Sequence, residues 1–208
     1  MSSSTVLADD SRLSWFDRAL LRIESTLNLL GGITIIALVV LAVVHVGGRK
    51  LFNAPVHGYV DWIEQFMIVF AFFGLSYCQR EGGHIRMDIL VGKLKGRALW
   101  LAEWVSVVFM AILTLGLIYG TWHHFLRSFD WGAPLFSRDS TIDIGLPIWP
   151  AKLIVPVMLT IFGLRLMLQI IGYWRALRRA EARPVAVPLP DDPMAQAARE
   201  ADAVSGKD

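Results

Sequence analysis

Four long apolar runs constrain this chain more than any other feature of its sequence. They cover residues 29–47, 60–79, 98–123 and 151–173. Each is close to or above the ~20 residues that cross a hydrocarbon core of about 30 Å. A soluble domain of 208 residues would carry more than 18% charged residues and would spread its apolar residues at amphipathic spacing. The sequence therefore predicts an all-α integral membrane protein with four transmembrane helices.

The segment before the first run has its own periodicity. Residues 1–10 are polar, whereas in residues 11–28 apolar side chains recur at spacings of three and four, with charged ones largely between them. That pattern predicts an amphipathic helix lying at the membrane interface and leading into the first span. A simple extension of the first membrane helix explains the same pattern equally well.

Lysine and arginine positions predict the orientation of the four spans, because cytoplasmic loops carry an excess of both. With both termini in the cytoplasm, twelve basic residues lie inside and five lie outside. The inside set is Arg12, Arg18, Arg22, Arg80, Arg86, Lys93, Lys95, Arg97, Arg175, Arg178, Arg179 and Arg183, and the outside set is Arg49, Lys50, Arg127, Arg138 and Lys152. We therefore expect both termini to be cytoplasmic.

The end of the chain differs from the membrane segments in composition. From Arg175 it is basic, and from Arg183 it contains four prolines and a short Ala-rich stretch, which is typical of disorder. We divide the chain into a polar N-terminus with the amphipathic helix (1–28), a four-helix membrane domain (29–174) and a basic, then disordered cytoplasmic tail (175–208).

No motif for catalysis or cofactor binding is present. The sequence lacks a Gly-x-Ser-x-Gly motif, a phosphate-binding loop and a zinc-like cluster of histidines and carboxylates. It also lacks the internal repeats and broken helices of transporters that work alone. The net charge of +2 is too small to indicate a nucleic-acid partner. We expect neither an enzyme nor an independent transporter, with no cofactor or metal site in this chain.

Arg165 is the main charged residue near the centre of a predicted span. Our preferred interpretation is that its side chain extends to the inner interface, about 13 Å away by helical rise. The alternative is an ion pair with Glu103, near the inner end of the third span.

Two histidines leave open a different function. His45 and His123 are both expected near the outer ends of their spans, at similar depth. Histidines on facing helices of a four-helix membrane bundle can ligate a b-type haem. The alternative function is therefore a haem-carrying membrane anchor of a respiratory oxidoreductase, although histidines near an interface are more often hydrated.

Charged residues border the second apolar run on both sides. Asp61, Trp62 and Glu64 stand at its start, and a Gly-Gly-His turn follows its end. Carboxylates so close to a membrane are costly unless they are paired or hydrated, so we expect them to make contacts. We predict a charge pair between Arg49 and Glu64 or Asp61. The simpler interpretation is a hydrated helix N-terminus and an ordinary helix cap.

Several short motifs along the chain together resemble a known family. The motifs are Arg49, Trp62-Ile63-Glu64, Gly83-His84-Ile85-Arg86-Met87-Asp88, Ser140 and Gly145-Leu146-Pro147-Ile148-Trp149. Together they resemble the small membrane subunit of tripartite ATP-independent periplasmic (TRAP) transporters, the DctQ-like family, over residues 25–175. One departure is Gln65, which follows Glu64 where many relatives have a second acidic residue.

The resemblance implies a supporting role in a bacterial inner membrane. In this family the large membrane subunit carries the substrate and sodium sites, and a periplasmic solute-binding protein delivers an organic anion. The small subunit braces the static scaffold of the large one. The expected partners are therefore the large subunit, the binding protein and membrane lipid, with sodium bound in the large subunit and no nucleic acid.

Candidate residues for partner contact follow from this resemblance and from the rules of helix packing in membranes, where small residues allow close approach. Gly31, Gly32 and Gly74 are the small-residue candidates. The polar and aromatic candidates are Arg49, Asp61, Trp62, Glu64, Gly83, His84, Arg86 and Asp88.

Overall fold

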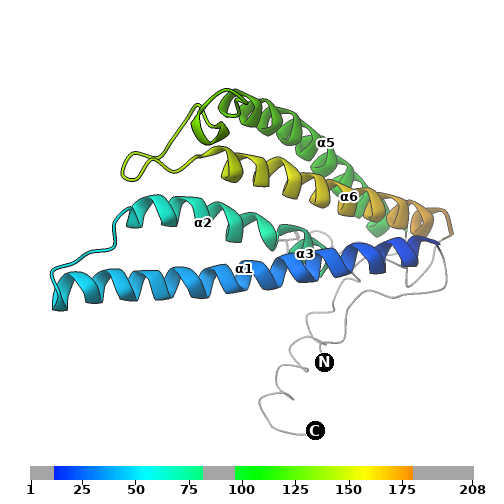
Figure 1. Cartoon of the computed structure of the whole chain (residues 1–208). Helices are drawn as coiled ribbons and strands as arrows, with labels where there is room; N and C mark the ends of the chain where they lie inside the picture. Colours follow the sequence, from blue (N-terminus) through cyan, green and yellow to red (C-terminus); the bar gives the residue numbers. More distant parts are fainter. Residues whose placement is uncertain (1–11, 82–96, 180–208) are drawn as a thin grey trace, which may run out of the picture.

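Helices account for nearly all of the regular structure. The structure is a computed structural model that describes residues 12–81 and 97–179. Its elements are α1 (Arg12–Leu51), α2 (Tyr59–Phe73), α3 (Leu75–Arg80), α5 (Arg97–Ser128), the short 3-10 helix η1 (Pro134–Phe136) and α6 (Trp149–Arg179) (Figure 1). Four helical segments, α1, α2 with α3, α5 and α6, are long and apolar enough to cross a membrane. The predicted all-α membrane fold with four spans is confirmed.

The helices form an open row in the order α1, α2, α6, α5 (Figure 1). α5 packs along α6, α1 packs along α2, and the two hairpins meet where α2 and α3 contact α6. α1 also reaches α3 and α6. Because α1 and α5 form opposite edges of the row, each leaves one side uncovered by the rest of the described chain.

The buried apolar core lies between α5 and α6. Its members include Trp100, Val107, Phe162 and Leu166, all at most 5% exposed. Gly163 assists this packing, because a Cβ atom there would lie 3.7 Å from Ile118 and 3.9 Å from Thr114. A small residue at that position lets the two helices approach closely, as is common in membrane proteins.

α1 agrees with the second interpretation of residues 11–28, in which the segment extends the first membrane helix. It is one continuous helix of 40 residues, about 60 Å long by helical rise, and it includes the segment 11–28 from Arg12 onward. Phe16 and Ile23 are more than half exposed, whereas Leu20 is buried together with the acids Asp17 and Glu24. The reason is the surroundings, because in hydrocarbon a charged side chain is stabilised only inside the protein.

The second predicted span, 60–79, runs across a break between α2 and α3 at Gly74. A Cβ atom at Gly74 would lie 3.4 Å from the Asn28 side-chain oxygen, and one at Gly31 would lie 3.3 Å from the Phe73 Cβ atom. Both glycines therefore allow α1 to approach α2 and α3 closely. They serve packing within the chain.

The segment between α5 and α6 is folded. α5 continues to Ser128, beyond the end predicted at residue 123. Two isolated bridges, Phe129 with Ser137 and Ser140 with Pro147, then shape the loop. The Phe129 ring packs edge-on against Trp149, with 5.4 Å between ring centroids. We call the end of the molecule that carries this loop the loop end, and the opposite end, where α1 begins, the N-terminal end.

Candidate functional site

A group of buried charges joins three helices near the N-terminal end. It contains Asp17 and Glu24 from α1, Arg80 from α3 and Arg165 from α6, and we call it the buried ion cluster. Each Arg165 nitrogen donates to an acid of α1: Nε donates to Glu24 at 2.8 Å, Nη2 donates to the other Glu24 oxygen, and Nη1 donates to Asp17. Arg80 donates to the second Asp17 oxygen at 3.1 Å. Arg80 also pairs with the partly exposed Glu81 at 2.9 Å. Within the four buried residues, two positive charges balance two negative ones.

Uncharged side chains extend this network. The Ser76 hydroxyl donates to Glu24. Gln79 donates its side-chain amide to Gln169 at 2.7 Å, and Gln169 donates in return to the backbone carbonyl of Gln79 at 3.2 Å. Removing one partner of a buried ion pair costs about 3–5 kcal/mol, because a charge is left without compensation. The network therefore fixes α1 against α3 and α6.

Helical spacing explains why these residues converge. Asp17 and Glu24 are seven residues apart, which is about two turns and places them on one face of α1. Arg165 and Gln169 are four apart on α6 and share a face in the same way. Each helix thus turns a polar stripe toward the same point.

The predicted position of the Arg165 side chain is wrong. Arg165 is fully buried, with no exposed surface, so it does not extend to the interface. Nor does it use Glu103, since all three of its nitrogens donate to Asp17 and Glu24. The sequence did contain a signal, namely two acids at helical spacing in one segment and one arginine in each of two other apolar segments.

At the loop end, Asp61 connects the start of α2 to the loop before α6. Its carboxylate accepts hydrogen bonds from the backbone N–H groups of Asp143, at 3.2 Å, and Ile144, at 2.8 Å. The Asp143 carboxylate in turn accepts from the backbone N–H of Gly58 at 3.0 Å. Gly58 has φ +66°, and a Cβ atom there would meet Ile144 at 2.5 Å, so only glycine fits.

These contacts replace the charge pair that we predicted for Arg49. Asp61 is 4% exposed and is bonded to the loop backbone. Arg49 and Glu64 are both exposed, and no ion pair joins them among the residues that the structure describes. Trp62, between the two acids, is 38% exposed and stacks on Phe66 with 5.9 Å between ring centroids.

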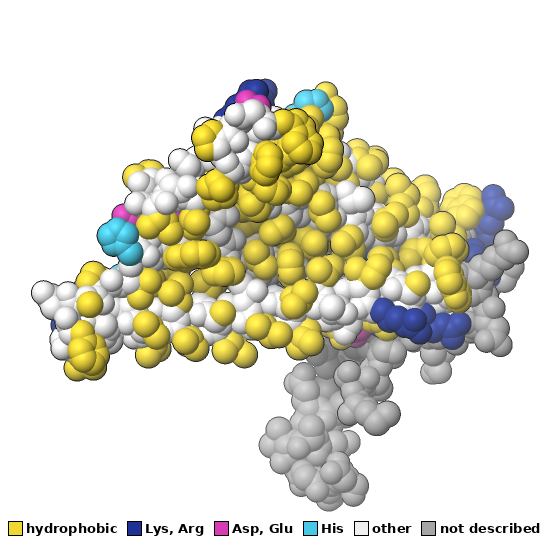
Figure 2. Space-filling model, viewed as in Figure 1, with side chains coloured by type: hydrophobic (Ala, Val, Ile, Leu, Met, Phe, Trp, Pro, Cys, Tyr) yellow, Lys and Arg dark blue, Asp and Glu magenta, His cyan; other side chains and the backbone are white. Residues whose placement is uncertain are grey.

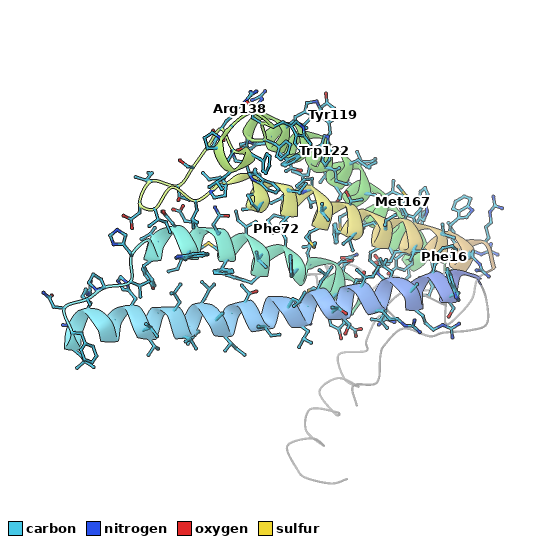
Figure 3. All side chains as sticks on the ribbon, viewed as in Figure 1. Phe16, Phe72, Tyr119, Trp122, Arg138 and Met167 are labelled. Carbon is cyan, nitrogen blue, oxygen red and sulfur yellow. The ribbon has the colours of Figure 1, made fainter. Side chains whose placement is uncertain are left out.

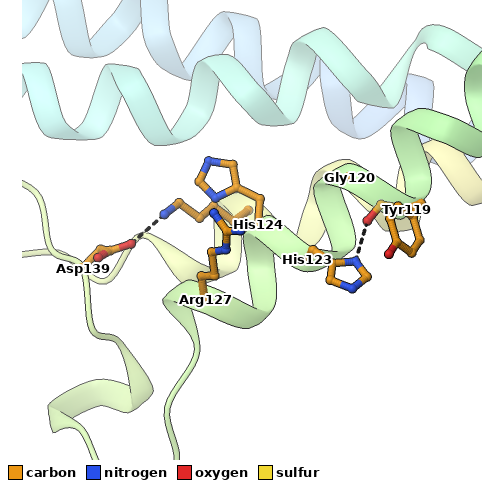
Figure 4. Close-up of a pocket in the computed structure, with 7 residues that line it drawn as sticks. Tyr119, Gly120, His123, His124, Arg127 and Asp139 are labelled. Atoms are coloured by element: carbon orange, nitrogen blue, oxygen red, sulfur yellow. Dashed lines mark hydrogen bonds and ion pairs between the residues drawn. The ribbon is translucent and has the colours of Figure 1, made fainter.

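Beside the loop lies a pocket of about 620 Å³, which we call the loop-end pocket (Figure 4). Its lining residues are Tyr119, Gly120, His123, His124, Arg127, Asp139 and Lys152. Lys152 donates to Asp139 at 2.7 Å and to the Ser128 hydroxyl oxygen at 3.1 Å, and the Ser128 hydroxyl donates to Asp139 at 2.7 Å. The hydrogen bond from Lys152, followed by that from Ser128, holds the pKa of Asp139 below its ordinary value.

The two histidines considered for haem binding lie on opposite edges of the row. His45 on α1 stacks on Tyr59, with 3.9 Å between ring centroids. His123 on α5 is exposed, and its Nδ1 atom lies 2.9 Å from the Tyr119 carbonyl oxygen. With α2 and α6 between α1 and α5, the structure does not bring the two rings together for a shared haem. Nor do the described residues contain a group of three or more His, Cys, Asp or Glu suited to a metal.

The remaining predicted contact residues fall into two groups. Of the three glycines, only Gly32 points into open space, since no atom lies within 4 Å of a Cβ atom built there. Gly83, His84, Arg86 and Asp88 lie outside the described residues.

Four apolar helices, held together by charges paired inside the chain, define a helical multi-pass membrane protein. Over residues 36–176 the chain matches the family described as the DctQ component of tripartite ATP-independent periplasmic transporters. The match covers more than half of the sequence, so the chain belongs to this family of transporter components, which are not enzymes. The predicted DctQ-like membership is confirmed. Among curated proteins, no match was found.

Proposed function

We propose that this chain is the small permease subunit that braces a large transport subunit for sodium-driven uptake of an organic anion. A periplasmic binding protein delivers the solute to that complex. One observation supports this role above others: the charges of the buried ion cluster pair with one another. They are therefore committed to holding helices together and are not available to bind a solute or a coupling ion. A supporting wall fits this arrangement better than a transport path does.

The surface that meets the large subunit is the outward face of α1. In the most apolar window of this helix only 6% of the residues are buried within the chain. Its large exposed residues include Leu29, Leu30, Ile33, Ile36, Val39, Val40, Val43 and Val44. Figure 2 shows hydrophobic side chains along this edge of the molecule. Gly32 lies among them and allows a partner helix to approach closely.

Co-purification with the large subunit tests this assignment. Gly32→Leu should weaken the complex, because the larger side chain keeps a partner helix away from α1. Uptake should fall in parallel, while solute binding to the periplasmic protein stays unchanged. Gly116→Leu is a matched control, since Gly116 also faces open space but lies on α5, at the other edge. A large subunit that is stable and transports at the normal rate without this chain would contradict the proposed function.

The proposed location is a bacterial inner membrane with both termini in the cytoplasm, which the distribution of basic residues supports. Single cysteines at Arg97, at the N-terminal end, and at the fully exposed Ile142, in the loop, test this orientation in a Cys78→Ala background. A membrane-impermeant maleimide added to intact cells should label Ile142→Cys and spare Arg97→Cys. The reverse pattern would overturn the orientation.

A further inference from the structure

The loop-end pocket has no role in the proposed bracing function, yet it combines a cavity with a surplus of basic side chains. It is built from the last turns of α5, the start of α6 and the loop between them (Figure 4). We propose that this pocket binds the phosphate group of an anionic membrane phospholipid. This inference does not depend on the identity of the partner subunit or on the orientation in the membrane, because phosphates border the hydrocarbon core on both sides.

The first support is the balance of charge in the pocket. Asp139 is already paired with Lys152. Arg127 lines the same cavity, and among the described residues no carboxylate pairs with it. Its guanidinium group therefore leaves the pocket with a net positive charge. Arginine is well suited to phosphate, because its planar fork of N–H groups can donate two parallel hydrogen bonds.

Donor groups remain available beside Arg127. The Lys152 ammonium group has three N–H donors, and the hydrogen bonds to Asp139 and Ser128 use two of them. His124 is exposed and lines the same cavity. A phosphate in the pocket can thus accept hydrogen bonds from residues of both α5 and α6.

The position of the pocket along α5 is the second support. It lies in the last turns of a helix that is long and apolar enough to span a membrane. Tyr119 is 70% exposed and Trp122 is 44% exposed, and Figure 3 shows Tyr119 on the side of α5 that faces away from α1. Exposed tyrosine and tryptophan near span ends are typical of the headgroup level of a bilayer. Lipid phosphates occupy that level.

The surface of α5 next to the pocket can accept an acyl chain. Gly120 lines the pocket, and Gly116 lies one turn further into the span on the same face. No atom lies within 4 Å of a Cβ atom built at either glycine, so the helix backbone is bare there. The exposed side chains of Ile112 and Leu113 continue this surface. Its apolar character favours a lipid over an acidic soluble protein, which would need only the charged residues.

Native mass spectrometry of the purified full-length chain in a neutral detergent can test this proposal. Wild-type protein should retain phosphatidylglycerol in preference to phosphatidylcholine. Arg127→Gln should weaken that retention roughly tenfold, the equivalent of one charge-assisted hydrogen bond. Gly120→Leu should weaken it as well, because leucine fills the pocket without changing its charge. Since a Cβ atom there meets open space, this variant should keep the wild-type circular dichroism and thermal midpoint.

Matched controls come from the opposite edge of the row. Arg49→Gln removes an exposed arginine near the same end, and Gly32→Leu fills open space on α1. Both should retain phosphatidylglycerol as the wild type does. If Arg127→Gln and Gly120→Leu retained as much phosphatidylglycerol as the wild type, the proposal would be overturned. Displacement of the lipid by inorganic phosphate at similar concentration would also overturn it, because the site would then take a free anion.

Discussion

The two charged regions of this protein use similar residues in opposite ways. In the buried ion cluster, Asp17, Glu24, Arg80 and Arg165 are at most 5% exposed, and their charges balance. In the loop-end pocket, the side chain of Asp139 is 46% exposed and basic residues are in excess. Burial makes the difference, since a desolvated charge must find its partner within the chain, whereas a hydrated one need not. The first region therefore holds helices together, whereas the second has excess basic groups with which to bind the proposed phosphate group.

The largest expected effect is that of Arg165→Met. The variant leaves Asp17 and Glu24 buried with only Arg80 to compensate them, so it should lose about 3–5 kcal/mol of stability against unfolding in detergent. Arg97→Met is the control, because Arg97 is an exposed arginine at the same end. Equal stability of the two variants would remove the contrast between buried and exposed charges.

A second experiment replaces the whole cluster with apolar residues. The variant combines Asp17→Leu, Glu24→Leu, Arg80→Met and Arg165→Met. Replacing a buried ion network with well-packed apolar residues is often neutral, so most of the stability lost in Arg165→Met should return, to within about 2 kcal/mol of the wild type. Denaturant unfolding of the two variants side by side measures this recovery. If the combined variant is the less stable of the two, the charges themselves are needed for packing.

Arg80→Met should have a smaller effect than Arg165→Met. Asp17 keeps its contact with Arg165 in this variant, so neither buried acid is left alone. Glu81 loses its ion pair with Arg80, but its side chain is 31% exposed and can be hydrated. We expect a loss of about 1–3 kcal/mol in the same unfolding measurement. A loss as large as that of Arg165→Met would mean that the two arginines act as one unit.

The smallest expected effect is the loss, in acid, of the contribution that Asp139 makes to the stability of the loop end. Because the pKa of Asp139 is lowered in the folded protein, its contribution to stability is complete above the ordinary carboxyl pKa. That contribution is lost as the pH falls through the lower folded pKa, below about pH 4. Tryptophan fluorescence from the loop should therefore stay constant from pH 8 to pH 5 and change only in stronger acid. Asp139→Asn should reduce that change, whereas a wild-type transition near pH 6 would point to another group.

Sequence reasoning found the spans because apolar runs of this length are rare in soluble proteins and are required in lipid. It missed the buried ion cluster for a specific reason. The spacing of Asp17 and Glu24 shows that they share a face with each other and not with Phe16 and Ile23, but it does not say which face points inward. That choice depends on the surrounding solvent, and lipid reverses the choice that water makes.

The contacts of Asp61 had no usable signal in the sequence. Its donors are backbone N–H groups of residues more than 80 positions away, and any residue except proline carries such a group. Gly31, Gly32 and Gly74 could be identified as small residues suited to helix packing. The sequence could not distinguish Gly32, which faces outward, from Gly31 and Gly74, which pack inside the chain.

The continuity of α1 has a rotational consequence. Successive residues of an α-helix are turned by about 100° around its axis, so shifting α1 by one residue against its neighbours would turn its whole surface through that angle. Asp17 and Glu24 accept from Arg165 in only one such position. Gly32 lies eight residues beyond Glu24 in the same unbroken helix, about 12 Å further along. The ionic contacts at the N-terminal end therefore set the direction in which α1 presents Gly32 and the apolar residues beyond it.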